Sequence, residues 1–362
     1  MITMANKIIL STDIGSDIDD ALALHIAMRH PEIDLLGVYT TNGDMELRAK
    51  IAKTMVDLSG HQTIVATGEA DALQGHPTAY STGSEKDAIR PEYKDKSLSD
   101  LEIVEDGVGD LVSRLKSDNP IIASIAPLTN VARAIEVEPS LDTPETKVYI
   151  MGGRLNNPEH NFRHDVEAAR QVLGSNLDLV VLSGDLCGKY RRPLEDFETL
   201  ESPSGHYIQE MLGHWNTYNT WRGFVMSGAS VDYPRMSGQG ARFPKYFTNL
   251  IDILNDPSFV KDHPEEYALA FASFIGVLEA NKDRPFFSEI SKKVEEQMPK
   301  EVAVHDTYII YAITHPDKLK TQKANLAVGP NGEMSIGKGN KHTLVTDLDF
   351  EHFKGFLGEY LR

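Results

Sequence analysis

Cysteine is nearly absent from this chain of 362 residues, which has only Cys187. A single cysteine excludes an internal disulfide and suits a reducing compartment. Long apolar runs are also lacking, since none approaches the roughly 20 residues that a membrane-spanning helix requires. The first apolar segment begins within about ten residues of Met1, which leaves no room for a signal peptide. We therefore expect a cytoplasmic protein with no membrane segment.

Positive charge is scarce as well. The sequence has 36 Lys and Arg against 54 Asp and Glu, a formal net charge of −18. This imbalance argues against nucleic acids and anionic membranes as partners and favours a small neutral or cationic ligand, held through a metal ion. The length allows one large α/β domain or two smaller ones.

Apolar strand-like segments and helical patterns alternate through the first half of the chain. Strands are predicted at 8–10, 33–39, 63–66, 121–125, 148–151 and 179–182, and helices at 20–29, 45–58, 109–117 and 130–135. Strand–helix–strand spacing of this kind predicts an α/β fold with a mainly parallel central sheet and helices on both faces. Ligands bind such sheets beyond the carboxyl ends of the strands. Several polar loops follow these strands and are expected to converge on one crevice, at Asp13, Thr41, Thr129 and Gly153.

The C-terminal half is organised differently. Residues 190–300 are rich in aromatics and mostly helical in pattern, so we expect a mainly helical insertion or cap over 185–300 within a single domain spanning 1–362. Beyond the apolar segment 303–313, Val328–Gly332 predicts a hairpin turn between two strands. A final helix is expected at 350–361.

The aspartates after the first strand are the most informative feature. Asp13, Asp17, Asp19 and Asp20 lie within eight residues, directly before an apolar helix. One or two aspartates there would be explained by capping or a turn. Four repel one another, and hard divalent cations prefer oxygen ligands. The cluster therefore predicts a metal site at the carboxyl end of the first strand.

Three further polar motifs have both a structural and a functional interpretation. Ala126–Asn130 is either a plain capped loop or part of the site. Glu159 and Asn161 on an extended segment would point the same way and bind vicinal hydroxyls, or they belong to a polar surface loop. The pair His305-Asp306 opens an apolar helix, either as an N-cap or as a functional pair.

Taken together and in this order, the motifs resemble the nucleoside hydrolase family of the calcium-dependent, inosine/uridine-preferring type. The resemblance covers roughly residues 6–70, 119–182 and 301–316. The motifs that carry it are Asp13-Ile-Gly15, Asp19-Asp20, Gly37–Thr41, Leu128–Asn130, Met151–Gly153, Glu159–Asn161 and His305-Asp306. It implies a nucleoside hydrolase-like, Rossmann-like fold that assembles as a homodimer or homotetramer.

The resemblance also implies a metal centre and two proton-transfer groups. Family members hold one Ca²⁺ through residues that correspond here to Asp13, Asp20, the backbone carbonyl of Thr129, and Asp306. Calcium takes 6–8 oxygen ligands, so positions are left for water and ribose hydroxyls. Asp13 is the implied base for that water. His305 corresponds to the leaving-group acid, and an unperturbed histidine titrates near ~6.5.

Ribose contacts are implied for a further set of polar residues. Asp19, Glu159 and Asn161 correspond to ribose ligands, with one of Asn156 or Asn157 helping. The first loop carries two extra residues, so Asp17 and Asp19 compete for one assignment.

Several positions depart from the family pattern. Asp44 replaces an Asn often found after the second strand, Ser11 replaces the first loop aspartate, and His160 replaces a Phe. Contacts to the nucleobase are not assigned, although the loop with His76 and Tyr80 corresponds to one that closes over the base.

We therefore expect hydrolysis of the N-glycosidic bond of a nucleoside to base and ribose, through an oxocarbenium-like transition state. A non-catalytic nucleoside or sugar sensor on the same scaffold, or a hydrolase of a non-standard N-riboside, is the alternative. A haloacid-dehalogenase-type phosphotransferase is set aside, because Ser11 stands where its nucleophilic aspartate is required and no downstream lysine motif is evident.

Overall fold

The computed structural model describes residues 5–74, 89–226 and 294–361, together with six isolated positions between 274 and 292. The chain divides into two compact units, Met1–Leu212 with Glu301–Arg362, and Gly213–Lys300. The loop with His76 and Tyr80 lies outside the described residues, as does most of the second unit. The helical insertion expected at 185–300 therefore stays a prediction.

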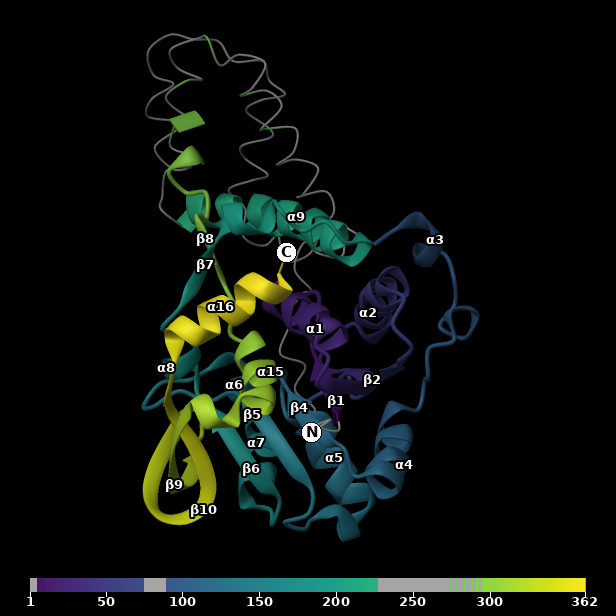
Figure 1. Ribbon diagram of the computed structural model, residues 1–362, viewed down its shortest axis with the longest axis vertical. Helices are drawn as coiled ribbons and strands as arrows, with labels where there is room; N and C mark the ends of the chain where they lie inside the picture. Colours follow the sequence, from purple (N-terminus) through teal and green to yellow (C-terminus); the bar gives the residue numbers. More distant parts are fainter. Residues whose placement is uncertain are drawn as a thin grey trace. The chain divides into compact units, whose positions relative to one another are not determined.

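A twisted sheet forms the centre of the first unit (Figure 1). Among the described residues it has eight strands in the order β3-β2-β1-β4-β5-β6-β10-β9. All neighbours pair in parallel except the C-terminal hairpin of β9 and β10. The strands are β1 (Asn6–Thr12), β2 (Ile33–Thr40), β3 (Ile64–Thr67), β4 (Ile121–Ser124), β5 (Lys147–Met151), β6 (Asp178–Leu182), β9 (Leu319–Val328) and β10 (Met334–Leu348). The predicted mainly parallel α/β fold is confirmed.

Helices form a layer on each face of this sheet (Figure 1). One layer comprises α2 (Met45–Ser59), α1 (Asp19–Arg29), α15 (Thr307–Thr314) and α16 (Phe350–Tyr360). The other comprises α4 (Gly107–Asp118), α5 (Thr129–Val137) and α7 (Val166–Gly174). Buried aliphatic side chains of the strands, such as Ile9, Ile122 and Val181, fill the space under the second layer. This burial is the main source of stability.

Further helices and strands lie outside these layers in the described part of the chain. They are α3 (Pro91–Lys94), α6 (His160–His164), α8 (Gly184–Cys187), α9 (Pro203–Met226), and β7 (Arg191–Pro193) paired with β8 (Glu301–Ala303). The apolar segment expected at 303–313 is thus divided between the end of β8 and α15. Among the described residues, no helix is both long and apolar enough to cross a membrane.

The strand order sets the position of a ligand crevice. The chain crosses over in one direction from β1 through β2 to β3, and in the other from β4 through β5 to β6. Loops that leave β1 and β4 therefore turn toward opposite faces and open a crevice at the carboxyl end of the sheet. The aspartate-rich loop follows β1 directly.

Candidate active site

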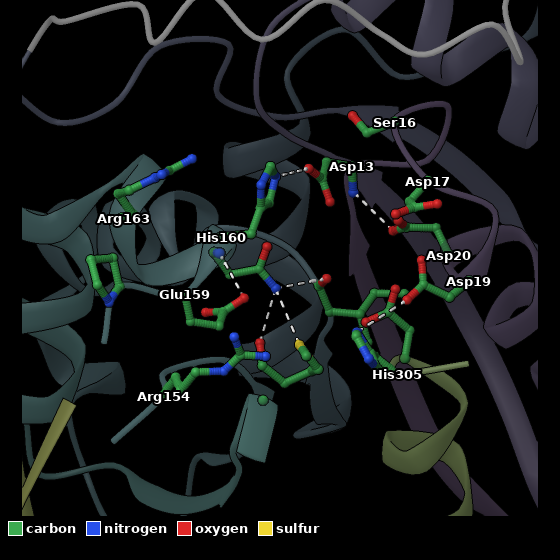
Figure 2. A pocket seen from close by; sticks show the side chains of 16 residues that line it. Asp13, Ser16, Asp17, Asp19, Asp20, Arg154, Glu159, His160, Arg163 and His305 are labelled. Carbon is green, nitrogen blue, oxygen red and sulfur yellow. Dashed lines mark hydrogen bonds and ion pairs between the residues drawn. The ribbon is translucent and has the colours of Figure 1, made fainter. Parts of the chain in front are cut away.

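A pocket of about 340 Å³ lies at this crevice, entirely within the first unit (Figure 2). Its walls come from the loops after β1, β4, β5 and β6, from α6, and from the start of α15. It is lined by Asp13, Ser16, Asp17, Asp19, Asp20, Ile125, Met151, Arg154, Pro158, Glu159, His160, Asn161, Arg163, Gly184, His305 and Asp306. Segments from near both ends of the sequence thus contribute to one polar cavity of a size that suits a small molecule.

Three buried carboxylates form a group suited to a cation. Asp19, Asp20 and Asp306 each offer an oxygen, and these oxygens lie within 4.8 Å of one another. Asp306 occupies the N-cap position of α15, yet its side chain makes no capping hydrogen bond. Burial first, and then the neighbouring carboxylates, raise the pKa values of all three well above the usual range for Asp. A divalent cation would offset this repulsion, so the donor set fits a bound metal ion.

Asp20 is held in place by the end of β1. The hydroxyl of Thr12 and the backbone N–H of Asp13 both donate to Oδ1 of Asp20, at 2.5 and 3.2 Å. With one carboxylate oxygen occupied in this way, the side chain has a fixed orientation toward the pocket.

Asp13 has a different electrostatic environment from the three grouped carboxylates of Asp19, Asp20 and Asp306. Burial alone would raise its pKa, but the interaction with His160 and the charge of Arg48 hold that pKa below its usual range. His160 Nε2 lies 3.7 Å from Asp13 Oδ2, and Asn42 Nδ2 donates to the same oxygen at 3.3 Å. Asp13 is therefore ionised near neutral pH and able to accept a proton.

Arg48, on α2, fixes the backbone of the aspartate loop and was missed in the sequence. Its guanidinium is fully buried and donates to the carbonyl oxygens of Asp13, Ile14 and Asn42 and to the hydroxyl of Ser16. A signal was present, because apolar residues at 51 and 52, three and four positions on, place residue 48 on the buried face of the helix.

His305 lies beside these three carboxylates, with its Nδ1 3.8 Å from Asp19 Oδ2. Burial, followed by the charges of Arg191 and Arg154, lowers its pKa to about 4. The pKa of this imidazole thus lies below the unperturbed value near ~6.5, and the ring is neutral at pH 7 in the free protein. A neutral imidazole still carries one N–H and can donate a hydrogen bond.

The prediction that Glu159 and Asn161 share an extended segment is also wrong. Helix α6 begins at His160, and Glu159 is its N-cap, accepting from the backbone N–H groups of Asn161 and Phe162. The buried Asn161 side chain donates to the carbonyl oxygens of Ile125 and Met151. Both residues nevertheless line the pocket.

Four other predicted residues are not among those that line the pocket. Asn156 and Asn157 are exposed in the loop before α6. Thr129 is buried, and its hydroxyl donates to Asp165. Asp44 caps α2 by accepting from the N–H of Leu47.

Two asparagines hold the ends of β1 and β2. The residue after β2 that contacts Asp13 is Asn42, in a left-handed conformation with φ of 69°, rather than Asp44. At the position of the missing aspartate, the Ser11 hydroxyl accepts from the side chain of Asn130. The same amide donates to the carbonyl oxygen of Thr40, so its hydrogen bonds tie the two strand ends together.

The family model of the inosine-uridine preferring nucleoside hydrolases matches residues 8–234 of this chain, a range that includes the aspartate loop and all the residues lining the pocket except His305 and Asp306. The chain belongs to this family. Members of the family are N-glycosyl hydrolases.

Individual relatives are similar at modest identity. Probable uridine nucleosidase 1 of Oryza sativa subsp. japonica is 27% identical over 231 residues, which cover 60% of this chain and 70% of the relative. The inosine-uridine preferring nucleoside hydrolase of Leishmania major is 30% identical over 200 residues, covering 51% and 62%. The solved plant nucleoside hydrolase PpNRh1 superimposes with a TM-score of 0.65 at 17% identity over 98% of both chains, which shows a shared fold.

Proposed function

We propose that this protein hydrolyses the N-glycosidic bond of ribonucleosides to a free base and ribose. The observation that carries the proposal is the convergence of four buried aspartates, Asp13, Asp19, Asp20 and Asp306, in one pocket of a nucleoside hydrolase family member. The names of the relatives, which include uridine nucleosidases, support the same reaction.

Calcium is the proposed cofactor, held by Asp20 and Asp306 together with Asp13 and the backbone carbonyl of Thr129. The grouping of Asp19 with Asp20 and Asp306 supports a divalent ion at this position. When bound, such an ion offsets the carboxylate charge and lowers the pKa of water.

Side chains of the protein accept the proton from water, bind the ribose and stabilise the departing base. Ionised Asp13 takes a proton from the attacking water while the water oxygen forms a bond to C1′ of ribose and the bond from C1′ to the base breaks. The Asp19 or Asp17 carboxylate, with Glu159 and Asn161, binds the ribose hydroxyls and stabilises the cationic character of the sugar. The N–H of His305 donates a hydrogen bond to the base as negative charge develops there, and the departing base takes its proton from solvent.

Cellular and assembly properties belong to the same proposal. The single cysteine supports a cytoplasmic location. A homodimer or homotetramer is proposed from the family resemblance.

The reaction is tested by following the label from H₂¹⁸O. Incubation with uridine and inosine is expected to give free base and ribose with one ¹⁸O at C1. Asp13→Asn should abolish release, whereas Asp317→Asn, at an exposed carboxylate outside the pocket, should retain it. Unlabelled ribose, or equal turnover by Asp13→Asn, would contradict the proposal.

A further inference from the structure

Two arginines of the pocket have no place in the chemistry above. Arg154 is half-buried in the loop after β5, and Arg163 is exposed on α6. Within the described part of the chain, neither guanidinium has a hydrogen bond or an ion pair. Several arginines elsewhere in the fold do pair with carboxylates, as in Arg114–Asp110, Arg133–Glu136, Arg170–Glu167 and Arg192–Asp196.

Glu159, the carboxylate that lies between the two arginines in sequence, is already satisfied. Glu159 Oε2 accepts from the backbone N–H of Gly153 at 2.7 Å, and Oε1 accepts from that of Asn161 at 3.0 Å. Its charge is therefore held by α6 and by the turn after β5. In a chain with 54 acidic residues against 36 basic ones, two unpaired guanidiniums on one cavity wall indicate a site for an external anion.

The two arginines and the carboxylates proposed to bind the metal ion occupy opposite sides of the pocket. Figure 2 shows Arg154, Arg163 and Glu159 on one side, and Asp17, Asp19 and Asp20 on the other, with the ring of His160 between them. A ribose whose 2′,3′-diol faces the carboxylates turns its opposite edge toward the arginines. That edge carries both the base, on C1′, and the 5′ carbon, on C4′.

We propose that the substrate is an anionic riboside whose negative group is bound by Arg154 and Arg163. This inference rests on the proposed function and names the substrate class of the same site. The group is a phosphoryl ester at C5′ or a carboxylate on the base, since both would lie on the edge that faces the arginines. The planar guanidinium fork binds either oxyanion with two parallel hydrogen bonds, and this geometry is one that lysine does not reproduce.

The two possible anionic groups are distinguished by comparing uridine with uridine 5′-monophosphate and orotidine. All three are pyrimidine ribosides, but the second carries a phosphoryl ester at C5′ and the third a carboxylate on the base. We expect kcat/KM for one of the two anionic substrates to exceed that for uridine by about tenfold or more. Arg154→Ala should reduce this ratio by about tenfold. The ratio is the readout because the Arg154 charge also acts on His305, and that effect is common to uridine and uridine 5′-monophosphate, which release the same base.

Matched variants complete the comparison. Arg163→Ala is expected to lower the ratio less than Arg154→Ala, because its side chain is exposed to water. Arg154→Lys retains the charge but loses the fork and should restore only part of the ratio. Arg170→Ala, outside the pocket, should leave it unchanged. Uridine cleaved as well as both anionic substrates would overturn the proposal, as would an anion preference that survives in both arginine variants.

If no riboside is cleaved, the proposed hydrolysis is refuted, but the anion site can still be tested. The test is then the binding affinity for anionic and neutral fragments of the substrate. Calorimetry with the calcium-loaded protein then compares ribose 5-phosphate with ribose, and orotate with uracil. Binding about tenfold tighter for one anionic member of a pair, lost in Arg154→Ala, would uphold the anion site. Equal binding within both pairs would overturn it.

Discussion

His160 Nε2 lies 3.7 Å from Asp13 Oδ2, so the proposed base of this enzyme faces an imidazole across the pocket. Although burial opposes a charge on either group, their interaction raises the pKa of His160 and lowers that of Asp13. The interaction therefore favours the charged form of each group, and His160 tunes the residue that accepts the proton from water.

His160→Phe tests this tuning. A lowered pKa keeps Asp13 ionised to lower pH, so loss of the imidazole should move the acidic limb of the kcat/KM profile to higher pH. The measurement is the pH dependence of kcat/KM between about pH 4 and 8. His61→Ala, outside the pocket, should leave the limb in place, and an unshifted limb in His160→Phe would show that the pair does not control Asp13.

His305→Ala should slow substrates according to their leaving groups. A neutral imidazole that donates to the departing base matters most when the base is a poor leaving group, so hydrolysis of uridine should fall by about 10²-fold. A p-nitrophenyl riboside needs no such donor and should lose much less. Because the pKa of His305 is lowered to about 4, no inflection near ~6.5 in the kcat/KM profile should depend on this residue. Equal losses on both substrates would refute its role at the leaving group.

Arg48→Met should destabilise the aspartate loop. The variant leaves the buried carbonyl oxygens of Asp13, Ile14 and Asn42 without their donor, at a cost of about 3 kcal/mol in the free energy of unfolding. Urea unfolding measures this loss, and calcium affinity should fall with it. Lys53→Met removes a partly exposed cation from the same helix and serves as the control. A stability loss no larger than that of the control would contradict the account.

Asp306→Asn should change the stability of the calcium-free protein in a pH-dependent way. Carboxyl groups with pKa values raised above 3.8 bind more protons in the folded state, so their contribution is greatest at low pH and is lost as the pH rises. Removing one charge should therefore stabilise the calcium-free protein at about pH 8 by about 1–2 kcal/mol relative to wild type, and by less at about pH 5.

Calcium should reverse this order of stabilities. Bound ion stabilises the folded wild type in proportion to its affinity, and the variant lacks one of the proposed ligands. Urea unfolding measures the stability of both proteins at both pH values, with calcium and with chelator. A variant that is less stable than wild type at the higher pH without calcium would show that the three carboxylates do not repel one another as described.

The regular alternation of apolar strands and helices along the chain made the sheet predictable from the sequence. The apolar strands and the helices between them agree with the structure to within a few residues, because consecutive parallel strands are buried on both faces and read as continuous apolar runs. Helix α6 was not predictable in this way. It has five residues and begins at a cap whose partners are backbone N–H groups, so no apolar periodicity marks it.

The aspartates after β1 were predictable because four of them lie within eight residues, whereas Asp306 was assigned only through the family resemblance. Asn42 and Arg48 were missed, since both act through contacts between separate elements, although the place of Arg48 on the buried face of α2 was a signal. Spacing also could not reveal that burial would lower the pKa of His305 while an ion pair raises that of His160. These properties depend on which loops meet at the carboxyl end of the sheet.

Calcium dependence of ribose release tests the central claim most directly. Chelator-treated wild type and Asp306→Asn are titrated with CaCl₂ while ribose release from uridine, uridine 5′-monophosphate and orotidine is followed. We predict that chelation abolishes turnover, that one calcium ion per chain restores it in wild type, and that the variant needs about 100-fold more calcium or fails to recover. Full turnover in excess chelator would contradict the proposed role of the aspartate cluster.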